Sequence, residues 1–282
     1  MGDWDYRPGD PIVSGLRAWA PLGGGRRCQT WLAWSTARGS PVVVKLPRPD
    51  LVGNAETLAD LRQEAEISAG LAHPAVQRVY EARLDAPLPY LVTEYVEGPT
   101  LTAAIAAGGP FHPGEAVHLG MQVAAALRYL HGSGVVHLDV KPSNICLRDG
   151  RPVLLDFGIA RRAGEPRRAG APRGSPPYMA PEQCRDEPAQ PSTDLFALGA
   201  VLYEAATGAL AFHPHRTGDG WEYPQLCGVP ESLPGLFGAL VTRLLDGDPA
   251  RRPADADAVL GLLGRALPPD EESLWPQWVH DQ

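Results

Sequence analysis

One polar stretch in the middle of the chain limits what it can fold into more than any other feature. Residues 137–144 read His-Leu-Asp-Val-Lys-Pro-Ser-Asn, and Asp156 opens an Asp-Phe-Gly triplet shortly afterwards. The stretch contains a potential base in Asp139, a cation in Lys141, and potential magnesium ligands in Asn144 and Asp156. Phosphoryl transfer needs these groups, because the acceptor hydroxyl must be oriented and the charge of the transferred phosphate must be neutralised. We therefore expect a fold that gathers these side chains for phosphoryl transfer.

The composition is that of a globular protein rather than a disordered one, with 282 residues of which 44% are hydrophobic and 21% charged. The length suits one two-lobed domain, or two small domains, with an ample apolar core. The net charge of -8 argues against a general nucleic-acid binder. No stretch approaches the run of about eighteen apolar residues that a membrane-spanning helix needs, so we expect no membrane span.

The four cysteines lie far apart and form no Cys-x-x-Cys pair. A structural zinc site and a disulfide framework are therefore not expected. The first residues, Met-Gly-Asp-Trp-Asp, lack the basic region and the apolar run of a secretory signal. Together these features predict a cytoplasmic protein in a reducing environment.

The pattern changes from strands to helices near residues 97–99. Before this point, short alternating or β-branched runs predict strands with one helix among them, and after it apolar residues at helical spacing predict several helices. The expected strands are residues 16–20, 30–34, 41–45, 76–83 and 90–95, and the expected helices are residues 55–72, 113–131, 192–207, 233–245 and 254–267. This order predicts an α+β protein with a small β-rich lobe and a larger α-helical lobe.

The expected domain organisation follows from that change. Residues 1–11 would form an irregular lead-in, residues 12–96 the small lobe with one main helix, and residues 97–267 the helical lobe. Residues 268–282 would form a tail that is acidic at first and then carries two tryptophans. The tail could dock a partner or fold back on the helical lobe, and folding back is the favoured interpretation.

Residues 22–25, Leu-Gly-Gly-Gly, break the first expected strand and lie before the second. Glycines there let backbone N–H groups approach a phosphate without obstruction by a Cβ atom, although three glycines also suit a flexible turn. Lys45 ends the third expected strand and could reach phosphates if an acid held it in place. The next helix offers both Glu64 and Glu66 for that purpose. Taken singly, such charged residues are more often ordinary surface residues.

These motifs, in this order, resemble the protein-kinase family and are most similar to bacterial eukaryotic-like (Hanks-type) serine/threonine kinases. Residues 178–182, Tyr-Met-Ala-Pro-Glu, look like the end of the activation segment. Asp194 looks like the helical residue that ties down the catalytic-loop backbone, and Arg252 looks like the arginine that pairs with Glu182. The resemblance covers about residues 12–267, nearly the whole chain.

The resemblance implies a two-lobed kinase fold that uses ATP with Mg²⁺ or Mn²⁺. Asp139 would accept the proton of a substrate hydroxyl, and Lys141, at the spacing typical of serine/threonine kinases, would stabilise the γ-phosphate. Asn144 and Asp156 would hold the metal, which prefers oxygen ligands. His137 would be a structural residue, hydrogen-bonded near Asp156.

The resemblance also implies how the nucleotide is bound. Lys45 would contact the phosphates, held by Glu64, because the Leu-Ala-His-Pro motif at residues 71–74 favours Glu64 over Glu66. The implied nucleotide-binding residues are Leu22, Gly23, Gly24, Gly25, Thr30, Lys45, Thr93, Glu94 and Val96.

Departures from the family pattern predict how activity is controlled. Leu138 replaces the usual arginine before the catalytic aspartate, the non-RD pattern, and residues 159–174 contain no serine or threonine. We therefore predict that activity does not depend on phosphorylation of the activation loop.

The five arginines of this loop could attract an acidic or phosphorylated substrate, but a solvated basic loop is favoured. Cys28 replaces the third glycine of the family's glycine-rich loop. Arg26 and Arg27 could activate its thiol, but the favoured interpretation is that Cys28 is only a tolerated small residue.

The favoured interpretation is an ATP-dependent protein serine/threonine kinase with an unidentified protein substrate, as a monomer or weak homodimer. A pseudokinase acting as a nucleotide-binding scaffold is the alternative, suggested by Leu138, the missing third glycine and Ser175 in place of threonine. Against it, the residues needed for transfer are all present: Lys45, Glu64, Asp139, Lys141, Asn144 and Asp156. The intact Ala-Pro-Glu at residues 180–182 argues against a small-molecule kinase. Whether the chain is complete or a fragment is left open.

Overall fold

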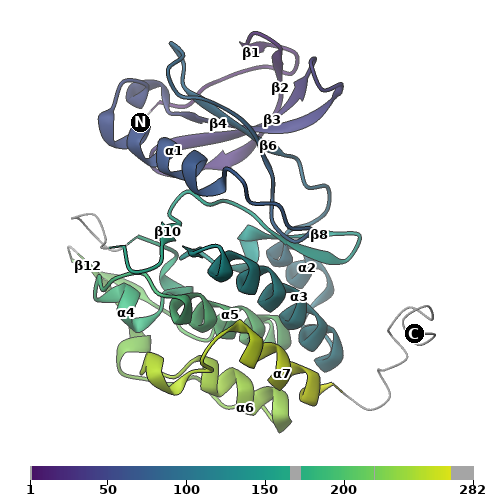
Figure 1. Cartoon of the computed structure of the whole chain (residues 1–282), viewed down its shortest axis with the longest axis vertical. Coiled ribbons are helices and arrows are strands. Elements are labelled where there is room, and N and C mark those ends of the chain that lie inside the picture. The colour runs from purple at the N-terminus through teal and green to yellow at the C-terminus, as the bar shows by residue number, and fades with distance from the viewer. Residues whose placement is uncertain (1, 166–172, 219, 268–282) are drawn as a thin grey trace. The chain divides into compact units, whose positions relative to one another are not determined.

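The computed structural model describes residues 2–165, 173–218 and 220–267. The expected tail and much of the arginine-rich loop lie outside the described residues. By its internal contacts the chain divides into two units: the N-unit, up to residue 97 together with residues 156–158, and the C-unit, residues 98–155 and those from 159 onward (Figure 1). The sequence predicts a boundary at nearly the same place, after residue 96, but assigns residues 156–158 to the helical lobe.

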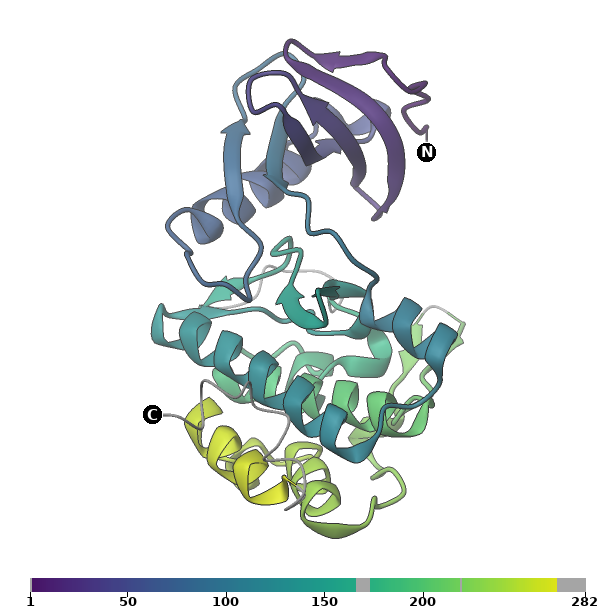
Figure 2. The ribbon, with the colours of Figure 1, turned by 90° about the vertical axis from the view of Figure 1, so that its right-hand side faces the viewer.

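The N-unit is built on a six-stranded antiparallel sheet with the strand order β1-β2-β3-β4-β6-β5 (Figures 1 and 2). Its strands are β1 (Pro11–Val13), β2 (Leu16–Gly24), β3 (Cys28–Ser35), β4 (Ser40–Pro47), β5 (Val79–Arg83) and β6 (Tyr90–Glu94). A short 3-10 turn, η1 (Pro49–Leu51), precedes helix α1 (Ala55–Ser68). The helix begins at Asn54, whose side chain accepts a hydrogen bond from Thr57 N and so satisfies one of the unpaired N–H groups at the helix start.

Strand β2 continues through the glycines, although the sequence predicts that residue 22 breaks it. Gly23 pairs with Thr30 of β3, and Gly24 also stays in the antiparallel ladder. A Cβ atom on Gly24 would lie only 2.8 Å from the carbonyl oxygen of Cys28, so glycine permits this close pairing. The predicted break was wrong because the ladder offsets the weak strand propensity of glycine.

Helix α1 ends at Ser68, earlier than the expected end at residue 72. Ala69 has an extended backbone with ψ of 114°, and Gly70 follows with φ of +91°. Such a positive φ suits glycine, which has no Cβ atom to clash with the backbone. The helix therefore stops before Pro74. The other expected strands and helices are present, with ends that differ by a few residues.

The first residues pack against the N-unit sheet, where the sequence predicts an irregular lead-in. The Trp4 ring stacks on Tyr6 with centroids 5.5 Å apart, and Tyr6 meets Trp31 of β3 edge to face at 5.3 Å. The Trp4 indole also donates a hydrogen bond of 2.8 Å to Pro47 O. These contacts join parts of the chain that are far apart in the sequence, so no local pattern marks them.

The C-unit is mainly α-helical (Figure 2). Its helices are α2 (Leu101–Gly108), α3 (Pro113–Gly132), α4 (Pro181–Cys184), α5 (Pro191–Thr207), α6 (Gly235–Leu244) and α7 (Ala256–Ala266). Antiparallel pairs of short strands are β7 (Val135–Val136) with β10 (Arg161–Arg162), β8 (Ile145–Arg148) with β9 (Arg151–Leu154), and β11 (His215–Thr217) with β12 (Gly220–Glu222). Its 3-10 turns are η2 (Pro142–Asn144), η3 (Pro176–Tyr178), η4 (Pro224–Leu226) and η5 (Pro249–Arg251). A β-rich unit followed by a helical unit confirms the predicted α+β class.

Small residues let the helices of the C-unit approach one another closely. A Cβ atom on Gly120 of α3 would lie 3.2 Å from the Leu202 methyls of α5 and from Leu263 Cδ1 of α7. On Gly199 of α5, a Cβ atom would lie 2.7 Å from Leu244 Cβ of α6. Since the buried faces of α3 and α5 are largely apolar, these helices form the core that supports the loop after α3.

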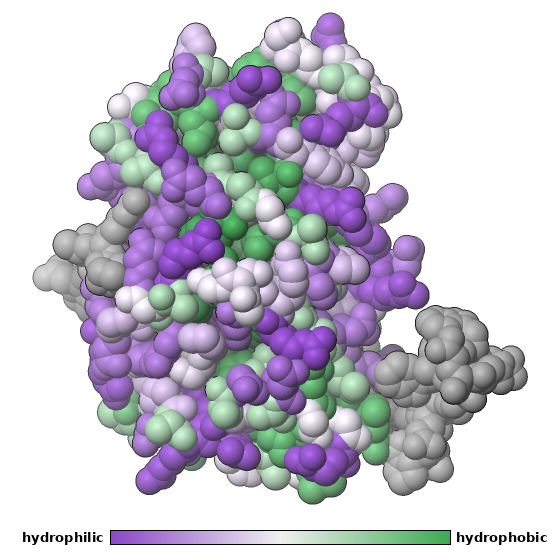
Figure 3. Space-filling view, viewed as in Figure 1, coloured by the Kyte–Doolittle hydropathy of each residue, from purple (hydrophilic) through white to green (hydrophobic). Residues whose placement is uncertain are grey.

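The surface mixes hydrophilic and hydrophobic residues over the face shown in Figure 3. Exposed large hydrophobic side chains include Trp19 and Trp34 in the N-unit and Val229 and Leu236 in the C-unit. Within the described ranges, the structure contains no helix of the length and hydrophobicity needed to cross a bilayer.

Candidate active site

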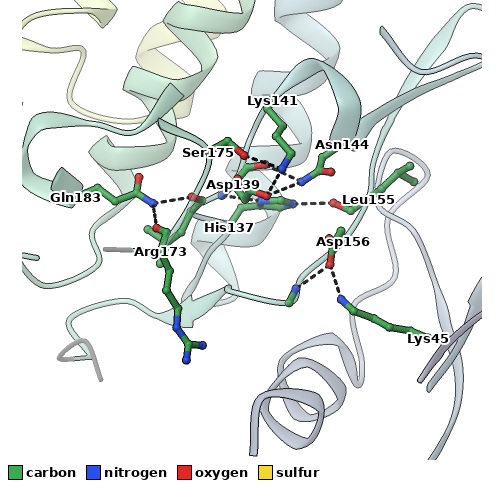
Figure 4. A network of polar contacts seen from close by, with 12 residues as sticks. Lys45, His137, Asp139, Lys141, Asn144, Leu155, Asp156, Arg173, Ser175 and Gln183 are labelled. Atoms are coloured by element: carbon green, nitrogen blue, oxygen red, sulfur yellow. Dashed lines mark hydrogen bonds and ion pairs between the residues drawn. The ribbon is translucent and has the colours of Figure 1, made fainter. Parts of the chain in front are cut away.

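Lys45 of β4 is held between two carboxylates of the N-unit. Its Nζ lies 2.8 Å from Glu64 Oε2 on α1 and 2.7 Å from Asp156 Oδ1, a contact drawn in Figure 4. Burial would lower the pKa of Lys45, but the charges of Asp156 and Glu64 outweigh it and raise the pKa above its ordinary value. Burial raises the pKa of Glu64, and Lys45 opposes part of that rise. Glu66 is exposed, so the acid that pairs with the lysine is Glu64.

Asp156 has a left-handed backbone with φ of +58°, which aspartate tolerates better than most residues. Its Oδ1 accepts a hydrogen bond of 3.1 Å from Gly158 N in addition to the contact with Lys45. A Cβ atom on Gly158 would lie 2.9 Å from Lys45 Nζ and 3.0 Å from Asp156 Oδ1. Glycine is therefore needed at this position because a side chain would crowd the lysine and its partners.

The expected nucleotide-binding residues of the N-unit lie on neighbouring strands. Thr30 of β3 stands opposite both Gly23 of β2 and Lys45 of β4. Thr93 of β6 is buried and pairs with Val43 of β4. The rest of the set lies near the ends of β2 and β6: Leu22, Gly24, Gly25, Glu94 and Val96. The sheet thus brings together residues that span much of the N-unit sequence.

Arg27, which the sequence analysis considered only as a neighbour of Cys28, contacts helix α1. Its Nη1 lies 2.6 Å from Asp60 Oδ2, and its Nη2 also pairs with Glu56. Glu56, Asp60 and Glu64 are spaced by four residues on α1, so they share one face of the helix. Arg27 and Lys45 therefore bind the same acidic face of α1. The four-residue spacing of the acids was the signal that could have revealed this.

In the C-unit, Asp139 is the centre of a hydrogen-bonded group (Figure 4). Its Oδ2 lies 2.7 Å from Lys141 Nζ and 2.9 Å from Asn144 Nδ2. Lys141 also donates to Ser175 Oγ at 2.7 Å. The other oxygen, Oδ1, is buried and accepts no hydrogen bond from any described residue. One oxygen of Asp139 is thus fixed by two donors, while the other has no donor among the described residues.

The backbone of this loop is held by Asp194 of α5, as expected. Asp194 is fully buried, and its two oxygens accept hydrogen bonds of 2.8 Å from His137 N and Leu138 N. His137 is also buried; its Nδ1 accepts from Asp139 N at 3.2 Å. Its Nε2 therefore carries the proton and donates to Leu155 O at 3.1 Å. This arrangement agrees with a structural role for His137.

Leu138 lies in an apolar cluster instead of offering a charge. It is buried against Val136, Ala189 and Ile159, with a left-handed backbone at φ of +66°. Gln183, which the sequence analysis did not single out, donates from Nε2 to Leu138 O at 2.8 Å. A non-glycine residue with this φ is strained, so its neighbours must hold it there.

Cys28 has an environment that disfavours an activated thiol. Burial raises its pKa to about 11, and Lys45 only partly opposes this. Of the two arginines thought able to activate it, Arg26 is exposed and Arg27 is paired with α1. The thiol is therefore protonated at neutral pH, in line with the favoured interpretation of a tolerated small residue.

The residues expected to hold a divalent metal present oxygen ligands, which Mg²⁺ prefers. In the C-unit, the amide nitrogen of Asn144 donates to Asp139, which leaves the amide oxygen as the ligand atom. In the N-unit, the Asp156 side chain is 49% exposed. No group of three His, Cys, Asp or Glu side chains suited to a metal occurs among the described residues. Each of the two residues therefore offers an oxygen atom of the kind that a divalent metal prefers.

Comparison with known proteins places these features in one family. The family model described as "Protein kinase domain" matches residues 17–260. A probable serine/threonine-protein kinase of Streptomyces coelicolor is 34% identical over 256 residues, covering 84% of this chain and 37% of the relative. The serine/threonine-protein kinase PrkC of Bacillus subtilis is 35% identical over 194 residues, covering 68% of this chain and 30% of the relative.

A third relative, the serine/threonine-protein kinase PknB of Mycobacterium tuberculosis, is 37% identical over 207 residues, covering 70% of this chain and 32% of the relative. The chain thus spans about a third of the length of the curated relatives it matches. The matched region includes both the Lys45 group of the N-unit and the Asp139 group of the C-unit.

Proposed function

Because this chain belongs to the protein kinase family, among relatives that are bacterial serine/threonine kinases, we propose that it transfers the γ-phosphate of Mg-ATP to a serine or threonine hydroxyl of a protein. The observation that carries the proposal is the hydrogen bonding of the two carboxylate oxygens of Asp139. Its Oδ2 is fixed by Lys141 and Asn144, and its buried Oδ1 accepts no hydrogen bond from the described residues. A substrate hydroxyl would donate its proton to the Asp139 carboxylate, which orients the hydroxyl oxygen for attack on phosphorus.

Lys141 supports the choice of a serine or threonine acceptor. Its ammonium contacts both Asp139 and Ser175, so the base is linked to the segment that would receive the substrate peptide. The same ammonium would stabilise the negative charge of the transferred phosphoryl group. Two short contacts, each of 2.7 Å, hold Lys141 in place for this role.

In the N-unit, Lys45 would bind the phosphates of ATP. Glu64 and Asp156 keep its ammonium charged and oriented, which lowers the entropy cost of the contact. Residues Leu22 to Gly25 and Thr30 would cover the nucleotide, and Thr93, Glu94 and Val96 would bind the adenine. Asn144 and Asp156 would hold Mg²⁺ or Mn²⁺. Held there, the metal would supply positive charge to offset the charge of the transferred phosphate.

We also propose that activity is independent of activation-loop phosphorylation. Leu138 occupies an apolar cluster with Val136, Ala189 and Ile159, and an added phosphate would find no cation at residue 138. Protein treated with phosphatase should therefore keep its turnover rate. A modified loop residue that proves necessary for turnover would contradict this part of the proposal.

The proposed setting is the cytoplasm, where the four free thiols would stay reduced. The substrate protein is unidentified, and the chain would act as a monomer or weak homodimer. The competing hypothesis is a pseudokinase that binds nucleotide as a scaffold. It is favoured by the departures at Cys28, Leu138 and Ser175, but the paired state of Lys45 and the ordered surroundings of Asp139 argue for transfer.

The first experiment measures γ-phosphate transfer from Mg-ATP to the protein itself and to a generic basic protein. The Asp139→Asn variant serves as the comparison, with nucleotide binding measured separately. Since general-base catalysis contributes about 10²–10⁴-fold, transfer should fall by at least about 100-fold in the variant while nucleotide still binds. Nucleotide binding without transfer by the native chain would favour the scaffold instead.

A further inference from the structure

We propose that Gln183 is a positioning residue that holds the peptide bond between Leu138 and Asp139 in its catalytic orientation. This inference rests on the proposed kinase activity and adds a residue that the family resemblance did not assign. Gln183 follows the Ala-Pro-Glu motif, lies in α4 and is only 3% exposed. Its side-chain amide connects the loop that carries the base to the activation segment.

Both polar groups of the Leu138–Asp139 peptide are occupied. The carbonyl of Leu138 accepts a hydrogen bond from Gln183 Nε2 at 2.8 Å, and the N–H of Asp139 donates to His137 Nδ1 at 3.2 Å (Figure 4). On the preceding side, Leu138 N donates to Asp194 at 2.8 Å. The peptide plane is therefore held from both ends, and its orientation sets where the Asp139 carboxylate points.

The need for this restraint follows from the backbone of Leu138. Its φ of +66° places the Cβ atom close to the backbone, a conformation that an L-amino acid other than glycine leaves when it is free to do so. Rotation of the peptide would relieve the strain but would also turn Asp139. Asp194 restrains one side of Leu138, and Gln183 restrains the carbonyl on the other.

The same amide nitrogen binds the activation segment. Gln183 Nε2 donates a second hydrogen bond of 2.9 Å to Arg173 O. Gly174, with φ of +135°, is the next residue, and a Cβ atom there would lie 2.7 Å from Gln183 Nε2. The absence of a side chain at residue 174 thus leaves room for the amide. One neutral side chain therefore links the catalytic loop to the activation segment, independently of any phosphate.

The test compares Gln183→Met and Gln183→Glu with Gln225→Met. Gln225 is a matched control because it is also 3% exposed and its Nε2 donates to two backbone carbonyls, Pro176 O at 2.8 Å and Met179 O at 3.0 Å. These two hydrogen bonds do not involve the catalytic loop, so their loss should lower stability by a similar amount. Gln183→Met should lower kcat by about 10–100-fold more than Gln225→Met, with little change in KM for ATP.

The pH profile separates positioning from simple loss of packing. At neutral pH the carboxylate of Gln183→Glu can only accept hydrogen bonds, so it faces two carbonyls without a proton to donate. When it is protonated at lower pH, it can donate one hydrogen bond to Leu138 O. Its kcat relative to the native protein should therefore rise as pH falls, while that of Gln183→Met should stay constant. Parallel profiles for the two variants would overturn the proposal.

Hydrogen exchange gives a readout that does not depend on activity. The Asp139 amide should exchange faster in Gln183→Met than in Gln225→Met, because its peptide has lost one restraint. Equal exchange in the two variants would overturn the inference. If the native chain transfers no phosphate, the proposed function fails while the exchange measurement still decides the role of Gln183.

If Gln183→Met does not fold, Gln183→His provides a second test because histidine keeps one N–H donor. The Asp139 amide should then be more protected from exchange in Gln183→His than in Gln183→Glu at neutral pH. Equal protection in these two variants would count against the proposal.

Discussion

The guanidinium of Arg252 forms a two-point ion pair with the carboxylate of Glu182, with Nη1–Oε1 and Nη2–Oε2 distances of 2.7 and 2.9 Å. Both side chains are almost completely buried. Arg252 also donates to Asp246 O and Ser192 O, and its guanidinium lies 5.0 Å from the centre of the Phe196 ring. The pair that the sequence predicted is therefore a fully satisfied structural link within the C-unit.

Replacing Glu182 with glutamine should destabilise the C-unit strongly. The change leaves the buried Arg252 charge without its anion, and breaking such a pair costs about 3–5 kcal/mol. Urea unfolding followed by circular dichroism would measure this loss. The control is Asp257→Asn, which removes an exposed ion pair with Arg128 and should cost no more than about 1 kcal/mol. Equal stability of the two variants would contradict the structural role.

Replacing Glu64 with glutamine should reduce phosphate transfer. Lys45 would keep Asp156 but lose its second anion, so its ammonium would be less well placed for the phosphates. We expect kcat to fall about 100-fold, in line with the effect of misplacing a catalytic group. Glu66→Gln, on the exposed face of the same helix, should stay close to the native rate. Equal rates in the two variants would show that the Lys45–Glu64 pair is not needed.

Replacing Arg27 with methionine should weaken the link between the β2–β3 turn and helix α1. Arg27 is one-third exposed, so its ion pairs with Glu56 and Asp60 stabilise this arrangement by less than about 1 kcal/mol. We therefore expect kcat/KM for ATP to fall by no more than about fivefold. Steady-state kinetics at low and high salt would measure the effect, which salt should reduce. Arg26→Met is the matched control, since Arg26 is exposed. A larger loss in Arg26→Met would refute the assignment.

The thiol of Cys28 should react slowly with alkylating agents at neutral pH. Burial raises its pKa to about 11, above the ordinary value of 9.0, so the thiolate fraction is about 100-fold smaller than for an unshifted thiol. The rate should rise about tenfold per pH unit until the pH approaches 11. Iodoacetamide labelling followed by mass spectrometry would test this in a variant whose only cysteine is Cys28. The exposed Cys227, as the only cysteine in a second variant, provides the comparison. Rapid labelling of Cys28 at pH 7 would contradict the protected state.

The sequence was sufficient for the class of the fold and for the order of the chemical groups. Strand and helix periods are local properties, so the change from a β-rich unit to a helical unit was visible along the chain. The family resemblance favoured Glu64 over Glu66, and the match of Asp139, Lys141 and Asn144 to the family's catalytic loop implied a connected group. The structure then shows that Asp139 contacts both Lys141 and Asn144.

The tertiary structure alone decided how these groups are held. Leu138, with its left-handed backbone, donates a hydrogen bond to Asp194 and accepts one from Gln183, and both partners lie far along the chain. The continuation of β2 through its glycines depends on pairing with β3, and the packing of Trp4 and Tyr6 depends on Trp31. The contacts of Leu138 and of the first residues join distant segments through single hydrogen bonds or rings. They leave no repeating pattern in the sequence, because their energy comes from neighbours that only the folded chain brings together.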